Sequence, residues 1–579
     1  MMAWIPVVLL AVPLLGALLL LLAPDALRPV LRTYGLILSA VTLVASLVLV
    51  AAFDHARPAA MQFELDLPWI PDLGLRFHLG VDGISLPLVT LTALLTFLCF
   101  VYLSRGRGAV GARPRALVFT LLVLEVGMIG TFLALDLLLF FVFFEIVLIP
   151  MYFLIGIWGG ERRRAASVKF ILYTLLGSVV MLLGLLLVWA QTGTLDIVAL
   201  TESHGAGMSR SVQILAFVAI GVGLAVKTPM WPLHTWLPDA HTEAPTVGSV
   251  LLAGVLLKMG TYGFARIAIP VLPEGAAAVA PWLGAFAVVG IVYGALACLA
   301  QRDLKRMIAY SSVGHMGFVL LGFATLTPVG INGALFANVA HGLITGLLFF
   351  LAGAIKERHH TADMPTLGGG LLARLPRLGS LLTFAAIASL GLPGLAGFWG
   401  EMLALLGAFQ PGAGLPLGLF RTYMVIGGLG AVLTAAYFLV MLSRVTHGRP
   451  RTPAGAERPA VDDRLMPSTV PDERPVTPTT PDERPVTPTT PDERPVTPTT
   501  PDERSFAPAG GEPDVAATTA VPASATALAE RAAPAPDVEP NEWLAWTPLV
   551  VLTLLFGLWP GLLLSLTTPP VQALLGALS

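Results

Sequence analysis

Long apolar runs constrain the fold of this chain more than any other feature of its sequence. A helix needs about 20 predominantly apolar residues to cross the hydrocarbon core of a bilayer. About fourteen segments of the 579-residue chain meet this requirement. Hydrophobic residues make up 56% of the sequence and charged residues only 12%. We therefore predict an all-α polytopic membrane protein with about 14 transmembrane helices instead of a set of soluble domains.

The predicted helices account for most of the chain. Their approximate ranges are 3–23, 31–53, 80–103, 116–135, 137–158, 165–190, two within 210–270, 277–300, 308–327, 331–355, an interrupted helix at 380–410, 421–446 and 543–567. Alternating apolar and polar residues in the segment 54–78 favour a short hairpin outside the bilayer. The N-terminal run lacks a basic region and a small-residue cleavage site, so we interpret it as a membrane helix and not as a signal peptide.

Basic residues concentrate in the loops on one side of the predicted bundle. They are Arg28 and Arg32 after the first helix, Arg105, Arg107, Arg113 and Arg115 after the third, Arg162, Arg163 and Arg164 after the fifth, Arg302, Lys305 and Arg306 after the ninth, Lys356, Arg358, Arg374 and Arg377 after the eleventh, and Arg444, Arg449 and Arg451 after the thirteenth. The positive-inside rule makes this side cytoplasmic. With an even number of helices, both termini are expected outside.

The stretch from 221 to 262 combines buried charge with a helix break. An apolar helix reaches Lys227 and is interrupted by Pro229 and Pro232, and the next apolar helix carries Lys258 in its interior. Such charges are tolerated in a membrane when they face a bundle interior, a water-filled cavity or a counter-ion. The stretch therefore indicates part of an ion path. The alternative is that Lys227 snorkels from a helix end and Lys258 is paired for structural reasons.

Four further ionisable residues in the predicted helices are candidates for the same path: Glu145, His315, His341 and Glu401. Glu401 follows the break GLPGLAGF and is expected in about the first turn of the second half-helix, where an anion is favoured. Lys227 ends the first half of the other broken helix, and a helix C-terminus favours a cation. For the histidines, the alternative role is a simple hydrogen bond between helices.

Three other ionisable residues have structural interpretations. Glu125 in the fourth helix is expected to be a neutral, hydrogen-bonded acid. Lys169, near the start of the sixth helix, is expected to snorkel, and Asp136 is expected to mark the turn between the fourth and fifth helices.

The two broken helices, the seventh and the twelfth, are five helices apart. Helices 4–8 and 9–13 would then form two five-helix repeats, and because five is odd the repeats would be inverted, which is typical of transporters. The predicted domains are three N-terminal helices (1–115), the first repeat (116–270), the second repeat (271–447), a linker (448–541) and a C-terminal helix (542–579).

The predicted linker differs from the rest of the chain in composition. It contains PDERPVTPTT three times in tandem, starting at Pro471, Pro481 and Pro491. The repeat has almost no large apolar residue, so it cannot bury a core, and its prolines favour extended conformations. We predict a disordered cytoplasmic segment; a docking segment is the alternative.

No sequence motif indicates a redox cofactor or a metal. Cys99 and Cys298 lie far apart in apolar runs, and the chain has no CxxC, no Cys/His cluster at metal spacing and no glycine-rich phosphate loop. We therefore expect no flavin, haem, iron–sulfur cluster or metal in this chain. Its net charge of −2 gives no indication of nucleic acid as a partner.

Four stretches of the sequence resemble the antiporter-like subunits of respiratory complex I. They are FFVFFEIVLIPMYFLIGIWGG, VKTPMWPLHTWLPDAHTEAPTVGSVLLAGVLLKMGTYG, RDLKRMIAYSSVGHMGFVLLG and GLPGLAGFWGEM. The second stretch alone is also similar to subunits L and N and to Mrp-type sodium/proton antiporters. EIVLIPMYFLIGIWGG and Glu401 favour the subunit M type of bacterial NADH-quinone oxidoreductase, since sister subunits tend to have lysine in place of Glu401. The resemblance covers nearly the whole chain except the insert 448–540, which departs from the family's usually short final loop.

The resemblance implies a role for each candidate residue. Glu145 and Lys227 would control an input half-channel, Lys258 would be the central relay, His315 and His341 would continue the path, and Glu401 would be the exit-side group. The resemblance also implies partners, namely complex I membrane subunits of the L, N, K, J, A and H types and the peripheral NADH-oxidising arm. NADH, FMN, iron–sulfur clusters and quinone would be held by those partners, and the complex would lie in the lipid of the bacterial plasma membrane.

Two functions of different classes fit this sequence. One is a proton-translocating subunit of an NADH:quinone oxidoreductase, in which this chain moves protons and carries out no redox catalysis itself. The other is a subunit of an Mrp-type antiporter that exchanges Na⁺ for H⁺. A structural membrane scaffold is the third alternative. Neighbouring genes would distinguish the first two functions. Genes for an NADH-oxidising module would support the first, and an Mrp-type operon would support the second.

Overall fold

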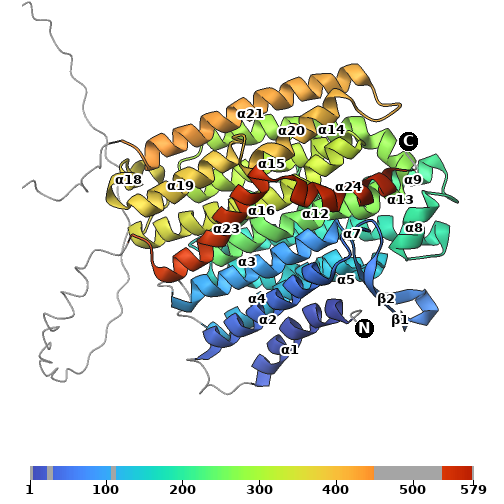
Figure 1. Cartoon of the computed structure of the whole chain (residues 1–579), viewed down its shortest axis with the longest axis horizontal. Coiled ribbons are helices and arrows are strands. Elements are labelled where there is room, and N and C mark those ends of the chain that lie inside the picture. Colours follow the sequence, from blue (N-terminus) through green and yellow to red (C-terminus); the bar gives the residue numbers. More distant parts are fainter. Residues whose placement is uncertain (1–3, 23–29, 106–112, 449–536, 577–579) are drawn as a thin grey trace, which may run out of the picture. The chain divides into compact units, whose positions relative to one another are not determined.

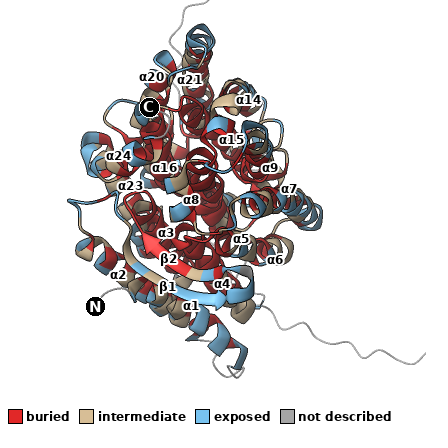
Figure 2. Cartoon of the chain, turned by 90° about the vertical axis from the view of Figure 1, so that its right-hand side faces the viewer, coloured by how far each residue is buried: buried red, intermediate tan, exposed pale blue. Residues whose placement is uncertain are grey.

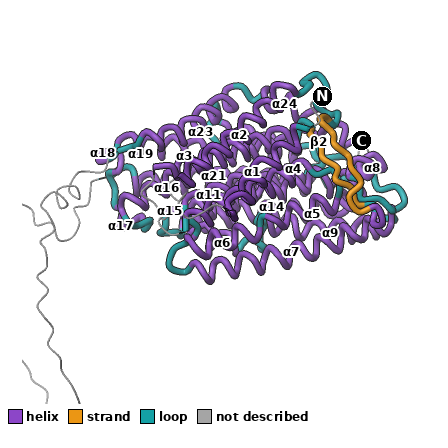
Figure 3. The backbone as a smooth tube through the Cα atoms, turned by 90° about the horizontal axis from the view of Figure 1, so that it is seen from below, coloured by secondary structure: helices purple, strands orange, loops and turns teal. Residues whose placement is uncertain are grey.

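The computed structural model describes residues 4–22, 30–105, 113–448 and 537–576. In these ranges, the long helices run side by side along one direction (Figures 1 and 3). The helices are α1 (Ile5–Leu22), α2 (Leu31–Ala52), α3 (Ser85–Arg105), α4 (Pro114–Leu133), α5 (Leu137–Ile146), α6 (Leu148–Trp158), α7 (Arg163–Thr192), α8 (Ile197–Ser203), α9 (Arg210–Lys227), α10 (Trp236–Glu243), α11 (Thr246–Leu251), α12 (Leu257–Gly263), α13 (Ile269–Val271), α14 (Pro273–Leu299), α15 (Leu304–Ala324), α16 (Pro328–His359), α17 (Met364–Leu367), α18 (Leu371–Arg374), α19 (Pro376–Ser389), α20 (Ala396–Phe409), α21 (Leu417–Val445), α23 (Pro540–Leu558) and α24 (Gly561–Leu575).

The predicted all-α membrane architecture is confirmed, with one candidate span fewer than the predicted fourteen. Among the described residues, thirteen segments are long and apolar enough to cross a membrane. The short helices α19 and α20 are not among them, and together they form the predicted interrupted helix. The spans Thr246–Val271 and Pro328–His359 are wholly buried along their most apolar stretch. In contrast, α7 exposes leucines along one face, for example Leu176 at 70%, as expected for a helix that faces lipid.

Both predicted helix breaks are present. The helix α9 ends at Lys227, and α10 begins only at Trp236, after the segment that contains Pro229 and Pro232. The second break separates α19 from α20, and there Gly391 and Gly394 adopt positive φ angles of 80° and 93°. Side chains with a Cβ rarely adopt this conformation, so these glycines permit the turn.

The span Thr246–Val271 contains irregularities that the sequence did not predict. Two π-helical segments, η3 (Leu252–Leu256) and η4 (Phe264–Ala268), flank α12 on either side. Such bulges change the direction in which side chains leave the helix and are frequent at functional sites. The packing against α9 is also close: a Cβ on Gly260 would lie 2.6 Å from the carbonyl oxygen of Leu224. Only glycine allows this approach.

The predicted hairpin outside the helices is confirmed. The strands β1 (Gln62–Ile70) and β2 (Leu75–Val81) pair antiparallel, and the 3₁₀ turn η2 (Pro71–Leu73) joins them. The hairpin lies at the end of the bundle opposite α17 and α18 (Figures 1 and 3). β2 is mostly buried, whereas β1 is largely exposed (Figure 2).

Polar contacts fix the hairpin to the first-repeat helices. Asp136 caps α5 by accepting hydrogen bonds from the backbone of Leu138 and Leu139, as expected for a turn residue. His78 Nδ1 lies 3.1 Å from Asp196 Oδ2. Burial opposes protonation of this imidazole, but the hydrogen bond and charge of Asp196 outweigh it and raise the pKa of His78. Burial likewise opposes the charge of Asp196, yet its bond to His78 lowers the pKa of that carboxyl group.

Residues beside the two ends of the predicted linker are anchored to the segment 370–378. His447 accepts a hydrogen bond from Gly370, and Asp537 accepts hydrogen bonds from the backbone of Arg377 and Leu378. The tandem repeats between these anchors lie outside the described residues. The predicted domain boundaries and the inverted relation of the two repeats remain predictions.

Candidate functional site

Lys258 lies at the centre of the buried charges. It is fully buried in α12, between the two π-helical segments. Its Nζ donates a hydrogen bond to the carbonyl of Ala253 and lies 2.7 Å from His341 Nδ1. The π-helical segment η3 contains Ala253, so the helix irregularity supplies one of the two partners of this amine. The side-chain hydrogen-bond partner of Lys258 among the described residues is therefore the imidazole of His341.

His341 connects Lys258 to the second broken helix. The rings of His341 and His315 are 5.6 Å apart in an edge-to-face arrangement. His315 Nδ1 lies 3.0 Å from Glu401 Oε1, and His315 Nε2 lies 3.0 Å from Ser389 Oγ. Four of the six candidate residues therefore lie in one line from α12 through α16 and α15 to α20, in which a ring contact joins the two histidines.

A small cavity accompanies the second half of this line. Its volume is about 20 Å³, and His315, His341, Ser389 and Glu401 contribute polar groups to its lining. A cavity of this size that offers a water several polar partners can hold about one molecule. Water there would connect the two imidazoles, which do not bond to each other directly. The arrangement can thus pass protons between groups that each accept and donate them.

Glu401 differs in one respect from the sequence expectation. It is the sixth residue of α20 and lies in the second turn, whereas the sequence placed it in about the first. The helix dipole acts mainly within the first turn, so it is not the main reason for an anion here. The direct contact with His315, rather than the helix dipole, is therefore the main interaction that favours an anion at Glu401.

Lys227 and Glu145 lie close together at the first break. Lys227 ends α9, as expected, and is almost fully buried. Its Nζ donates a hydrogen bond of 3.1 Å to the carbonyl of Phe144 and lies 4.2 Å from the centre of the Phe144 ring. The charges of Lys227 and Glu145 interact electrostatically, but the ion pairs within 4.0 Å among the described residues do not include this pair. Glu145 Oε1 is buried without a hydrogen-bond partner there.

The half-helix α10 is held by ion pairs on both sides. Asp239 lies 2.7 Å from Lys169 Nζ on α7 and 3.5 Å from an Arg306 guanidinium nitrogen on α15. Glu243 accepts a hydrogen bond from the backbone of Arg162. Lys169 is 36% exposed, which agrees with a side chain that snorkels toward the helix end, and the structure adds a carboxylate partner from another helix.

Some buried ionisable residues were not anticipated by the sequence. Arg266 in η4 pairs with Asp82 at the end of β2, and both side chains are at most 3% exposed. Lys305 was assigned to a basic loop, yet it is buried in the first turn of α15. Glu125 is fully buried, and neither of its carboxylate oxygens has a hydrogen-bond partner among the described residues, so the expected hydrogen bond is absent there. A basic residue within an apolar run, as in FARIAIPV, was the available signal for Arg266.

Comparison with known proteins assigns the chain to a family. Residues 134–427, about half of the chain, match the family described as NADH:quinone oxidoreductase/Mrp antiporter, TM. The chain belongs to this family. The matched region contains all six candidate residues, from Glu145 to Glu401.

Individual relatives agree with this assignment. NADH-quinone oxidoreductase subunit M of Rhodobacter capsulatus is 45% identical over 398 residues, which are 67% of this chain and 75% of the relative. NADH-ubiquinone oxidoreductase chain 4 of Arabidopsis thaliana is 42% identical over 439 residues, which are 75% of this chain and 85% of the relative. The predicted resemblance to subunit M of complex I is confirmed.

Solved structures show the same fold. A chain of respiratory complex I from Thermus thermophilus with bound NADH superposes with a TM-score of 0.76 at 27% identity, covering 99% of this chain and 100% of that chain. A chain of the Mrp complex from Dietzia sp. has a TM-score of 0.74 at 21% identity, covering 99% of this chain and 98% of that chain. At this lower identity, the Mrp likeness concerns the fold alone.

Proposed function

We propose that this chain is a proton-translocating membrane-arm subunit, of the subunit M type, of an NADH:quinone oxidoreductase in a bacterial plasma membrane. The supporting observation is the line Lys258–His341–His315–Glu401, which leads from the span Thr246–Val271 to the second broken helix through buried, protonatable groups. Electrons would pass through partner subunits that hold NADH, FMN, iron–sulfur clusters and quinone. The loops rich in arginine and lysine would face the cytoplasm, and both termini would lie outside.

The direct test is removal of the central amine. Lys258→Met keeps an unbranched side chain of similar length but cannot carry a proton. In inverted membrane vesicles, we expect NADH-driven acidification of the vesicle lumen to fall strongly while the complex remains assembled. If quinone reduction is tightly coupled to pumping, it falls as well. Normal acidification by an assembled Lys258→Met complex would overturn the proposed function of this line.

The charges at the first break should act as one unit. We infer that Glu145 controls the proton held by Lys227, because their charges interact and Lys227 bonds to the carbonyl next to Glu145. Glu145→Gln and Lys227→Ala should each reduce pumping. The double variant should be little worse than either single variant, since coupled residues are not additive. Additive losses would show that the two residues act in separate steps.

The same vesicles separate the complex I function from the Mrp alternative. Acidification that depends on NADH and is indifferent to Na⁺ fits the first, whereas Na⁺-driven proton movement without NADH fits the second. We also expect the isolated polypeptide to contain no redox cofactor and to oxidise no NADH. A stoichiometric flavin or iron–sulfur signal in the purified chain would contradict this.

A further inference from the structure

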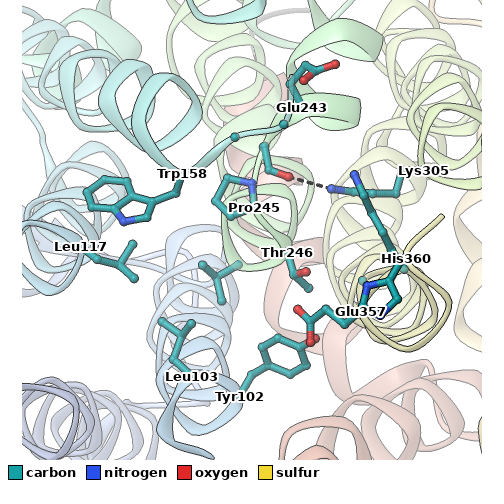
Figure 4. A pocket seen from close by; sticks show the side chains of 16 residues that line it. Tyr102, Leu103, Leu117, Trp158, Glu243, Pro245, Thr246, Lys305, Glu357 and His360 are labelled. Carbon is teal, nitrogen blue, oxygen red and sulfur yellow. Dashed lines mark hydrogen bonds between the residues drawn. The ribbon is translucent and has the colours of Figure 1, made fainter. Parts of the chain in front are cut away.

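A large cavity lies at the basic-loop end of the bundle, opposite the hairpin (Figure 4). Its volume is about 350 Å³, which is within the range of small-molecule sites in proteins. Residues of α3, α4, α6, α10, α11, α15 and α16, with a few residues of the adjoining loops, line it. None of the six candidate residues of the proton path is among them. The cavity is therefore distinct from the site described above.

The cavity lies at the level at which membrane-spanning segments begin or end. Trp158 is the last residue of the span Leu137–Trp158, and Thr246 is the first residue of the span Thr246–Val271. Lys305 is the second residue of a further span. Lipid headgroups lie at this level of a bilayer, and tryptophan is enriched there. The cavity is also on the side that the proposed orientation makes cytoplasmic.

The cavity combines an apolar wall with two cations. The residues of the apolar wall are Leu103, Leu117 and Trp158 (Figure 4). The cations are Lys356, which is exposed, and Lys305, which is only 2% exposed. The Nζ of Lys305 donates a hydrogen bond of 2.7 Å to the carbonyl of Ala244 (Figure 4). This bond uses one of the three ammonium protons and brings no counter-charge, so it does not neutralise the buried cation.

Two carboxylates also line the cavity, but one of them is already engaged. Glu243 accepts a hydrogen bond of 3.0 Å from the backbone of Arg162 and lies 3.8 Å from the guanidinium group of that residue. Glu357 is the other carboxylate. With the charge of Glu243 opposed by Arg162 and with His360 uncharged, the two lysines face one carboxylate. The lining then carries one net positive charge, which a singly charged anion would balance.

A buried hydroxyl group in the lining also calls for a partner. Tyr102 is 4% exposed, and its hydroxyl makes no well-formed hydrogen bond with a described residue, although Thr246 and Glu357 lie beside it. A buried polar group without a partner costs free energy. Because Tyr102 lines the cavity, an oxygen atom of a molecule bound there can accept this hydrogen bond.

We propose that this cavity binds a phospholipid through its phosphodiester group. The phosphate would lie between Lys305 and Lys356, and the apolar part of the molecule would contact the wall of Leu103, Leu117 and Trp158. A phosphodiester carries one negative charge, which balances the lining, whereas a phosphate monoester carries about 1.5 to 2 at neutral pH. Basic pockets between transmembrane helices on the cytoplasmic side are typical sites for anionic lipid headgroups. The inference goes beyond the proposed proton translocation and does not rest on it.

The test is photolabelling of the complete complex in dodecyl maltoside, a detergent without phosphate. The probe is a phosphatidylglycerol with a diazirine on the acyl chain close to the glycerol, and mass spectrometry identifies the labelled residues. We expect label on the apolar wall. Unlabelled dioleoylphosphatidylglycerol should displace the probe, whereas diolein, which has the same chains without the phosphate, and inorganic phosphate should not. Equal displacement by diolein would show a purely apolar site, and equal displacement by inorganic phosphate would show a site for free phosphate; either result would overturn the proposal.

Lysine variants test the role of the charge. Lys305→Met and Lys356→Met should each raise the half-saturating concentration of the probe about fivefold, since one lysine near the membrane surface contributes about that factor to the binding of anionic lipid. Arg302→Gln is the matched control, because Arg302 lies three positions before Lys305, is 73% exposed and does not line the cavity. It should leave labelling unchanged, and an equal rise in this variant would contradict a specific site. Absence of label from the apolar wall, or unchanged half-saturation in Lys356→Met, would overturn the proposal even if Lys305→Met does not assemble.

Discussion

The buried ion pair between Asp82 and Arg266 makes a quantitative prediction about stability. The pair joins the end of the hairpin to the span Thr246–Val271, with 2.5 Å between an Arg266 guanidinium nitrogen and Asp82 Oδ1. Arg266 Nε also donates to the Tyr262 hydroxyl, which in turn donates to the carbonyl of Phe132. Asp82 Oδ1 accepts from the backbone at the start of α3 as well.

Asp82→Asn should remove the charge without removing the helix cap. The asparagine side chain retains an oxygen that can accept the backbone hydrogen bonds of α3. Arg266 would then be a buried cation without its counter-charge, and breaking a buried pair in this way costs about 3–5 kcal/mol. Such a loss lowers the folding equilibrium constant by about two to nearly four orders of magnitude. The double variant Asp82→Asn with Arg266→Met should recover much of the loss, because replacing both charges by neutral groups is often nearly neutral.

The measurement is the amount of assembled complex and its thermal dissociation in native membranes. Even about 1–2 kcal/mol can change the abundance of a protein several-fold, so the single variant should be clearly depleted. The exposed pair Arg76–Asp66 provides the control, since its side chains are 46% and 35% exposed and such pairs contribute about 0–1 kcal/mol. Wild-type abundance and stability of Asp82→Asn would refute this reasoning.

Three further predictions concern the periphery of the bundle. Arg358 forms two hydrogen bonds of 2.8 and 2.6 Å with the carboxylate of Glu542. Arg358→Ala should therefore leave Glu542 as a buried carboxylate without its counter-charge and make the start of α23 sensitive to protease. Unchanged resistance of α23 to protease would contradict this. Deletion of residues 471–504 retains both anchors of the linker, so assembly and pumping should stay near wild type. Native gels measure assembly, and vesicle acidification measures pumping. Loss of assembly would instead indicate that the segment docks onto another subunit. The pKa of His78 is raised and that of Asp196 is lowered, so their pair should stabilise the hairpin when both are charged. The stabilisation should be complete between about pH 4, the ordinary pKa of Asp, and about pH 6.5, the ordinary pKa of His. That stabilisation is lost as pH rises through the folded-state pKa of His78 or falls through that of Asp196. Hydrogen exchange of the hairpin amides, corrected for intrinsic exchange rates, measures it. Protection that stays constant as pH passes through these two pKa values would count against the pair.

The sequence by itself determined the membrane architecture. Runs of apolar residues are decisive because, in hydrocarbon, backbone groups must be satisfied within each segment, so each run becomes a helix. The helix breaks at Pro229 and at Gly391 were likewise predictable, since proline and glycine act locally on the backbone. The candidate charges Lys258 and Glu401 could be found for the same reason: a charge in an apolar run is conspicuous.

Only the tertiary structure decided which of these charges meet. His341 and Lys258 are 83 positions apart in the sequence, and their contact depends on how α16 packs against the irregular helix around α12. The π-helical segments have no simple sequence signature, yet they supply a partner for the central amine. Lys305 shows the converse, because a basic residue beside a helix end is typical of an exposed loop, and only packing of α15 against the segment after α10 buries it. Apolar length is a local property of a chain, whereas a proton line depends on side chains from different helices, and no local pattern fixes their separation.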